Sequence, residues 1–274
     1  MRIIKKVALL LVMLVAVVIA AFDIWGYLTL GTINPTDTAQ YDDEANKVVM
    51  VFGATGSVGD GLLKAAIEDP TVEKVYVLSR RSSERIDAGV TSGKVTLYLH
   101  PDFTNYSEIS EQLAEVNTVL WGLGTSSLQV DDSTYTLIHV DFPMAFLDAW
   151  ITARTAAPMA FHFVAGVGTD PEGDDHWARE KGRIERQMAE LAEGTGLRTF
   201  SYRSAYIRPA SEQAHAFHYI GEALLKPGYL VITATELGQS MLEISARTEE
   251  LKNGTLLDNL DSIRYAKLYQ HRQF

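Results

Sequence analysis

Short, almost wholly apolar segments alternate along the chain with longer segments of helical periodicity. The apolar segments fall at residues 48–52, 75–78, 95–99, 118–121, 160–164 and 198–202. The helical segments between them include residues 60–68, 108–116, 135–154 and 177–191. Near-continuous apolar strands separated by helices predict a parallel sheet that is covered on both faces. Right-handed crossovers then give a doubly wound α/β fold, in which ligands bind beyond the carboxyl ends of the strands.

The pattern changes after the sixth strand. Residues 210–225 and 236–249 are predicted to be helical, and Lys226-Pro227-Gly228 separates them. Aromatic residues in the first of these segments are more typical of core packing than of a substrate site.

The N-terminal segment is apolar on every face. The run Val7–Phe22 has no break, and it resumes after Asp23 as far as Leu30. As a helix, residues 7–30 would extend about 36 Å, which exceeds the roughly 30 Å hydrocarbon core of a membrane. We therefore expect a single-pass membrane anchor over residues 1–30, a polar linker over 31–46 and one domain over 47–274.

Two further observations bear on this anchor. Trp25 and Tyr27 suit the membrane interface, whereas small residues at Val18 and Ala20 leave a cleavable signal peptide as the alternative. Basic residues at the start of the chain favour placing the domain across the membrane from the cytoplasm. A ligand found mainly in the cytoplasm would require the opposite orientation, so the side that the domain faces stays open.

Composition excludes several classes of function. The formal net charge of −11 over 274 residues argues against a nucleic-acid partner, which would require a basic face. Without cysteine the chain has neither disulfides nor thiolate chemistry. His162, His215 and His218 have no partners at metal-ligand spacing, so we predict no metal site.

The first apolar segment leads into a glycine-rich turn, Gly53-Ala54-Thr55-Gly56-Ser57-Val58-Gly59. In such a turn Gly53 permits the tight bend, Gly56 lets the backbone approach a pyrophosphate, and Gly59 lets the next helix pack closely. The helix then offers free N–H groups and a positive dipole end. We predict a dinucleotide phosphate site made by Gly53, Thr55, Gly56, Ser57, Val58 and Gly59, against the alternative of a merely structural turn.

The second strand ends at Ser79-Arg80-Arg81. A carboxylate here would bond the ribose 2′-hydroxyl of NAD, whereas two guanidinium groups match a 2′-phosphate. The sequence therefore favours NADP over NAD, with Arg80 and Arg81 as ligands. The alternative is that these arginines and Arg85 form a solvated run of charge.

Two other strand ends carry candidate cofactor contacts. Asp102, after the third strand, is predicted to accept a hydrogen bond from an adenine amine, although it could equally cap a helix. After the fourth strand, Gly122-Leu123-Gly124 would let the backbone pass beneath a bound cofactor, or form an ordinary turn.

Together these motifs resemble the atypical short-chain dehydrogenase/reductases. The glycine-rich turn, Ser79-Arg80-Arg81, Gly122-Leu123-Gly124-Thr125, Val140-Asp141, Phe161-His162-Phe163-Val164 and Leu256-Leu257-Asp258-Asn259 carry the likeness. It covers about residues 47–270, and the branch it resembles most is that of the Tat-interacting oxidoreductase. The resemblance implies a Rossmann sheet with a small C-terminal substrate region and NADPH as ligand.

The catalytic residues of that family are only partly present. Active members use a serine after the fifth strand and a Tyr-x-x-x-Lys pair on the next helix, where the lysine lowers the pKa of the tyrosine. Here Ala165 follows the strand, and Trp177 stands four residues before Lys181. An indole cannot exchange a proton near neutral pH. Lys181 is predicted to bind the nicotinamide ribose and to act in catalysis, and the candidates for the missing proton donor are Thr169, His176 and Tyr206.

Two functions follow from this pattern. One is an NADP(H)-dependent reductase of a small carbonyl-type substrate, which would need a proton donor that the family motif does not supply. The other is a non-catalytic NADP(H)-binding protein, tethered to a membrane, that senses the cofactor or supports a protein assembly. The substrate and any protein partner are not specified by the sequence.

Overall fold

A seven-stranded parallel sheet forms the centre of the computed structural model, which describes residues 2–272. The strand order is β3-β2-β1-β4-β5-β6-β9. The strands are β1 (Val48–Phe52), β2 (Lys74–Ser79), β3 (Val95–Leu99), β4 (Thr118–Trp121), β5 (Met159–Val164), β6 (Leu197–Tyr202) and β9 (Thr255–Leu257). The order reverses between β1 and β4, which opens a crevice at the carboxyl ends of these strands. The predicted doubly wound α/β fold is confirmed, with β9 as a strand that the hydrophobic pattern did not predict.

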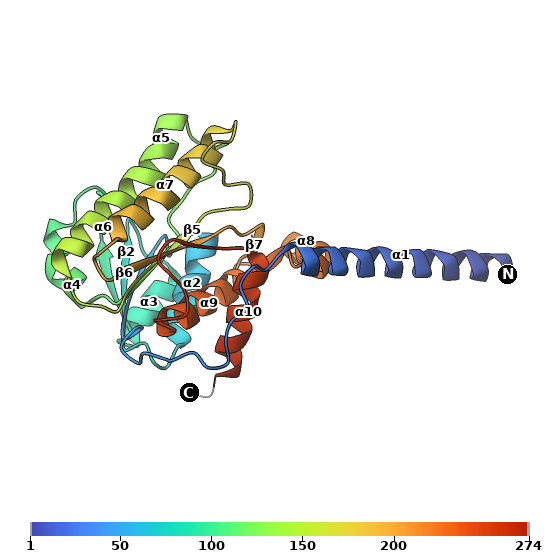
Figure 1. Cartoon of the computed structure of the whole chain (residues 1–274), viewed down its shortest axis with the longest axis horizontal. Helices are drawn as coiled ribbons and strands as arrows, with labels where there is room; N and C mark the ends of the chain where they lie inside the picture. Colours follow the sequence, from blue (N-terminus) through green and yellow to red (C-terminus); the bar gives the residue numbers. More distant parts are fainter. Residues whose placement is uncertain (1, 273–274) are drawn as a thin grey trace.

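Helices cover both faces of the sheet (Figure 1). One face packs against α2 (Ser57–Glu68), α3 (Glu84–Thr91), α9 (Ala234–Ala246) and α10 (Asn259–His271). The other packs against α4 (Ser110–Glu115), α6 (Phe142–Ala153) and α7 (His176–Ala192). Side chains of β1 alternate between the two layers: Val49 and Val51 join the first core, and Met50 and Phe52 the second. Burial on both sides explains why β1 is apolar at every position.

Several boundaries differ from the sequence-based expectation. Helix α2 begins at Ser57 rather than at residue 60, so Gly59 lies in its first turn. The expected helix over 135–154 consists of α5 (Asp132–Thr136), a π-helical segment η2 (Leu137–Asp141) and α6. Pro143 in the first turn of α6 has no backbone N–H to give to an α-helical partner, which is consistent with the change of winding just before it. A short 3₁₀ turn, η1 (Ser107–Ile109), likewise replaces the start of the helix expected at residue 108.

The C-terminal region is more divided than its periodicity suggested. A second, two-stranded sheet joins β7 (Tyr206–Arg208) and β8 (Val231–Thr233). Between them lie α8 (Ala216–Leu225), shorter than the helix predicted over 210–225, and the 3₁₀ turn η3 (Lys226–Gly228). Helix α9 starts at residue 234, two residues early, because the Thr233 hydroxyl accepts the backbone N–H of Glu236 at 3.0 Å.

Helix α1 (Arg2–Thr29) extends away from the rest of the molecule (Figure 1). Its segment Ile4–Thr29 is long and apolar enough to cross a membrane, a property that signal sequences share. Only its last turns touch the domain, where Phe22 and Gly26 pack against Gly228 of η3. The Tyr229 side chain lies near the Asp23 carboxylate, the one acidic group of this helix.

The segment 31–46 has no helix or strand, but it is held to the domain by a buried arginine. The guanidinium of Arg247, at the end of α9, donates to the Thr36 carbonyl oxygen at 2.8 Å and to the Tyr41 hydroxyl at 2.7 Å. It also donates to the carboxylate of Glu243 at 2.7 Å, and both charged side chains are almost fully buried. This arginine therefore joins the segment to the C-terminal helices.

We expect Arg247→Ala to lower the free energy of unfolding by about 3–5 kcal/mol, because it leaves the Glu243 carboxylate buried without its strongest partner. Urea unfolding of the detergent-solubilised protein measures this. The control is Arg186→Ala, which removes an exposed ion pair to Glu172 (3.6 Å) and should cost about 1 kcal/mol or less. Equal losses of unfolding free energy in the two variants would contradict the stabilising role of the buried Arg247.

Candidate functional site

The turns after β1 and β4 approach each other so closely that two positions accept only glycine. Gly53 has a φ of +72°, and a Cβ there would lie 2.5 Å from the Gly122 carbonyl oxygen. A Cβ at Gly59 would lie 2.1 Å from the carbonyl oxygen of Gly53. Gly53 and Gly59 are thus required by the packing of backbone on backbone, and a Cβ at Gly122 would be tight, 3.1 Å from the Cα of Gly59.

Gly56 is different, because the fold constrains it less than Gly53 and Gly59. The nearest atom to a Cβ at this position is the Gly53 carbonyl oxygen at 3.3 Å, and the residue is exposed. Gly56 is the N-cap of α2, and no side chain caps this helix end. The first turn of α2 therefore presents uncapped backbone to solvent, the arrangement that binds phosphate in dinucleotide folds.

Two adjoining hollows flank this helix end at the carboxyl edge of the sheet. One, of about 470 Å³, is lined by Gly53, Thr55, Arg80 and Arg81 among others. The second, of about 320 Å³, is lined by Gly56, Ser57, Val58, Gly122, Gly124 and, deeper, Trp177 and Lys181. Leu123 lines both hollows, so the two form one continuous crevice where the strand order reverses between β1 and β4. The cofactor-site residues predicted from the sequence line this crevice except two: Gly59, which is buried in the first turn of α2, and Asp102.

Of the three arginines after β2, two are unengaged. Arg85 makes a bidentate pair with the buried carboxylate of Asp60, at 2.9 and 3.0 Å, and is not available to a ligand. Arg80 and Arg81 are exposed, and within residues 2–272 neither guanidinium has a hydrogen-bond or ionic partner. Two free forked cations therefore lie at the edge of the glycine-lined hollow.

Asp102 lies just outside the crevice. Its Oδ1 accepts hydrogen bonds from the Thr104 backbone N–H at 2.9 Å and the Thr104 hydroxyl at 2.6 Å. These bonds lower the pKa of the carboxyl group and form a local turn. The neighbouring Phe103, which the sequence argument did not single out, lines the hollow instead.

Lys181 is buried at the floor of the second hollow. Its ammonium donates to the Val164 carbonyl oxygen at 2.9 Å and lies 4.4 Å from the centre of the Phe163 ring. Burial lowers the pKa of Lys181 to about 7, against a smaller opposing effect of Glu185. This lysine consequently loses its charge near neutral pH as the pH rises.

Trp177 and Ala165 both line the same hollow. The indole of Trp177 lies beside Gly168, where a Cβ would be 3.2 Å from the ring. Neither residue carries a group that can exchange a proton. The hollow therefore lacks the serine and the tyrosine at the positions where the family motif would place them.

Tyr135 and His139 also line this hollow, and the sequence argument missed both. They lie on α5 and η2, with ring centres 4.2 Å apart. Burial raises the pKa of Tyr135 to about 12, and burial lowers that of His139 to about 3, with Lys181 adding to the second effect. Their i, i+4 spacing was the signal in the sequence, but it did not show which face of the helix meets the crevice.

His139 is held against the turn after β4. Its Nε2 lies 3.0 Å from the Thr125 carbonyl oxygen and 3.2 Å from the Thr125 backbone nitrogen. Its buried Nδ1 has no hydrogen-bond partner within the part of the chain that the structure describes. Such an orphaned polar atom indicates a position where a ligand or water completes the site.

The three residues considered as substitute proton donors lie elsewhere. The Thr169 hydroxyl donates to the Gly166 carbonyl oxygen at 2.8 Å within its own turn. His176 Nε2 is 3.2 Å from the Thr136 hydroxyl. Tyr206 packs beside Gly221 of α8. None of them lines either hollow.

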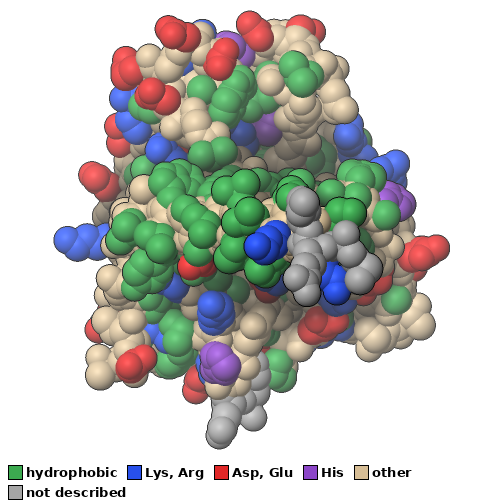
Figure 2. Space-filling view, turned by 90° about the vertical axis from the view of Figure 1, so that its right-hand side faces the viewer, with side chains coloured by type: hydrophobic (Ala, Val, Ile, Leu, Met, Phe, Trp, Pro, Cys, Tyr) green, Lys and Arg blue, Asp and Glu red, His purple; other side chains and the backbone are tan. Residues whose placement is uncertain are grey.

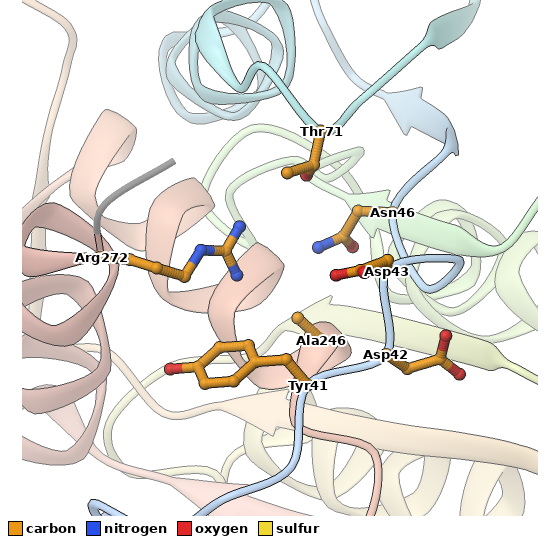
Figure 3. A pocket seen from close by; sticks show the side chains of 7 residues that line it. All are labelled: Tyr41, Asp42, Asp43, Asn46, Thr71, Ala246 and Arg272. Carbon is orange, nitrogen blue, oxygen red and sulfur yellow. The ribbon is translucent and has the colours of Figure 1, made fainter.

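A separate hollow of about 400 Å³ lies at the opposite ends of the strands from this crevice (Figure 3). Asn46 and Thr71 in its wall precede β1 and β2, so it faces the amino ends of the strands. Figure 3 shows Arg272 reaching toward it from the C-terminal helix and Asp43 beside Asn46 on the facing segment. Because ligands of doubly wound sheets bind at the carboxyl ends, the crevice at the glycine-rich turn is the stronger candidate.

Among the described residues no group of three His, Cys, Asp or Glu side chains is placed to hold a metal ion. His162, the most buried histidine, is instead bonded on both ring nitrogens, to the Tyr202 hydroxyl at 2.8 Å and the Ser245 hydroxyl at 2.7 Å. His215 and His218 cap the first turn of α8.

Comparison of the sequence with known proteins gives only remote relatives. No family model matches the chain. It is 26% identical over 146 residues to "Protein fmp52, mitochondrial" of Emericella nidulans, covering 52% of this chain and 60% of that protein. It is 23% identical over 129 residues to "Hybrid PKS-NRPS synthetase gkaA" of Penicillium citrinum, covering 47% of this chain and 3% of that protein. The chain thus spans less than two thirds of either relative.

Solved structures match over most of the domain. An oxidoreductase of the short-chain dehydrogenase/reductase family from Burkholderia thailandensis has a TM-score of 0.57 at 15% identity, covering 78% of this chain and 90% of that one. The 3-oxoacyl-[acyl-carrier protein] reductase from Brucella melitensis, in complex with NAD, gives 0.58 at 15%, covering 80% and 97%. A putative NAD(P)-dependent gluconate 5-dehydrogenase from Beutenbergia cavernae, with bound NADP, gives 0.58 at 14%, covering 78% and 95%. The chain has the Rossmann-type fold of the short-chain dehydrogenase/reductases.

Proposed function

We propose that this protein is an NADP(H)-binding oxidoreductase of the short-chain dehydrogenase/reductase type that reduces a small carbonyl-type substrate. The observation that carries the proposal is the pair of unengaged guanidinium groups, Arg80 and Arg81, beside the uncapped N-terminus of α2. The likeness in fold to NAD- and NADP-bound oxidoreductases supports it. The resemblance to the branch of the Tat-interacting oxidoreductase belongs to the same proposal.

The residues present fit such a cofactor. Gly56 and the first turn of α2 would hold the pyrophosphate, with Thr55, Ser57 and Val58 beside it. Arg80 and Arg81 would hold the 2′-phosphate. Gly122, Leu123 and Gly124 would pass beneath the cofactor, and Asp102 would lie at the adenine end with only its second carboxylate oxygen unengaged by Thr104.

We expect NADPH to bind more tightly than NADH, and the change Arg80→Ala with Arg81→Ala to weaken NADPH binding tenfold or more. Charge-assisted hydrogen bonds are worth about 1.5–3 kcal/mol each, and a loss of about 1.4 kcal/mol raises the dissociation constant tenfold. Isothermal titration with both cofactors measures this. The matched control, Lys252→Ala with Lys267→Ala, removes two exposed charges outside the crevice and should leave both affinities unchanged. Equal binding of NADPH and NADH by the unaltered protein would refute the NADP preference.

The reduction requires a hydride, which NADPH supplies when bound, and a proton for the carbonyl oxygen. Tyr135 is the residue with a phenolic hydroxyl that lines the second hollow, and it is neutral at pH 7 because burial raises its pKa to about 12. It can therefore donate a proton to an oxygen that becomes an alkoxide. Lys181, anchored at Val164, would orient the ribose end of the cofactor.

We expect Tyr135→Phe to lower the rate of carbonyl reduction about 10²–10⁴-fold while NADPH affinity stays the same. The reason is that the change removes only the hydroxyl that donates the proton. NADPH oxidation with a panel of aldehydes and ketones, under single-turnover conditions, measures the rate. Tyr98→Phe, which removes a hydroxyl on the edge strand β3, is the control. A rate unchanged in Tyr135→Phe would exclude Tyr135 as donor.

The second candidate function is non-catalytic binding of NADP(H), and the observation that favours it is the pair Trp177 and Ala165 at the family's catalytic positions. In that case neither the unaltered protein nor Tyr135→Phe oxidises NADPH with the panel of aldehydes and ketones faster than the uncatalysed rate. Trp177→Tyr, which restores the Tyr-x-x-x-Lys spacing to Lys181, would then be the change that creates activity, limited by the missing serine at Ala165.

The proposed location is a membrane, with α1 as a single-pass anchor. We expect the full-length protein to resist carbonate extraction, since burying Ile4–Thr29 in lipid is strongly favourable, and a chain starting near Thr36 to stay in the soluble fraction. Fractionation and immunoblotting measure both. A mature protein whose first residue lies near Ala21 would establish a signal peptide in place of the anchor.

A further inference from the structure

Helix α8 exposes its hydrophobic side and turns its polar side inward. Phe217, Ile220 and Leu224, spaced i, i+3 and i+7 on one face, are 64%, 63% and 69% exposed. No residue of the helix is buried. A surface helix of a water-soluble protein has the reverse arrangement, since its apolar stripe faces the core.

The inward side of α8 is held by polar contacts. Glu222, its one acidic residue, makes an ion pair with Arg208 of β7 at 2.6 Å. Gly221 lies against the Tyr206 ring. These contacts fix the rotation of the helix, so the exposure of its apolar face is a consequence of the fold.

This face lies at the domain end of α1. The turn η3 follows α8 directly, and its Gly228 is the residue against which Phe22 and Gly26 of α1 pack. Figure 1 shows α8 beside the last turns of α1. In Figure 2, where α1 points toward the viewer, hydrophobic side chains form a band that spreads sideways from the region of α1 across this face of the molecule.

We propose that the exposed face of α8 (Phe217, Ile220 and Leu224) lies in the interfacial layer of the membrane that α1 crosses. The inference rests on the proposed anchoring by α1. The segment Ile4–Thr29 would span about 39 Å, so its last turns emerge from a core of roughly 30 Å into the interface. Exposed Trp25 and Tyr27 mark the same level.

The chemistry of α8 fits a lipid surface better than water. Its exposed face carries no charge. Lys226 at its C-terminal end is 75% exposed although its ammonium lies 3.9 Å from the Glu222 carboxylate, so it can reach a lipid phosphate. Amphipathic helices lie in the membrane plane with their apolar face about 5–10 Å below the headgroups. Two points of attachment, α1 and α8, then hold the domain in one orientation against the bilayer.

Site-directed spin labelling tests this directly, because the chain has no cysteine and each variant carries a single label. The full-length protein is placed in phosphatidylcholine nanodiscs, one copy per disc, and labelled at Leu224→Cys or Ile220→Cys. The matched control is Leu99→Cys, a leucine 67% exposed at the end of β3. Collision of the nitroxide with oxygen, which partitions into lipid, is compared with collision with a water-soluble nickel chelate.

The expected result is a several-fold lower nickel collision rate at Leu224 and Ile220 than at Leu99, with a higher oxygen rate. A label at Val15→Cys reports the anchor separately. If Val15 is in lipid but Leu224 collides with nickel as Leu99 does, the anchoring stands and the role of α8 is overturned. If the label at Val15 is in water, both the anchoring by α1 and the role of α8 are refuted. Spin–spin coupling between Leu224 labels of two copies in detergent, without protection in single-copy discs, would show that α8 pairs two chains instead.

Discussion

The site depends on the contact between two backbone turns at the centre of the sheet. Side chains at Gly53 or Gly59 would collide with main-chain atoms, which cannot move without displacing a strand, and one at Gly122 would be tightly packed. Their absence allows α2 to begin at Ser57, directly against the turn after β4. The N-terminus of this helix consequently opens into the crevice where the strand order reverses.

Burial determines the protonation states of the side chains in the second hollow. The pKa of Lys181 falls to about 7, that of His139 to about 3, and that of Tyr135 rises to about 12, each mainly through loss of water. All three shifts favour the neutral form. For Lys181 the cost to folding grows as the pH falls from 10.5 toward 7, because the unfolded chain binds the proton more readily. A pocket of this kind is suited to donating a proton from a neutral phenol rather than from an imidazolium.

The C-terminal region connects this site to the anchor. The strand β7, which follows β6 at the carboxyl edge of the sheet, pairs with β8, and the chain between them forms α8 and η3. Arg208 on β7 holds α8 through Glu222, and Gly228 of η3 receives Phe22 of α1. A domain held by these contacts would present its crevice at a defined angle to the membrane.

The sequence alone determined the doubly wound sheet, the glycine-rich turn and the apolar helix α1, because each depends on local pattern: continuous apolar strands, glycine spacing and length. It also placed Arg80, Arg81, Trp177 and Lys181 at strand ends and on a helix that meet at one edge. Only the tertiary structure decided that Arg85 pairs with Asp60 while Arg80 and Arg81 have no partner among the described residues. It also decided that Tyr135 and His139 line the second hollow and that the apolar face of α8 points outward. Each of these depends on contacts between segments far apart in the chain, and local periodicity carries no information about which partner a side chain meets.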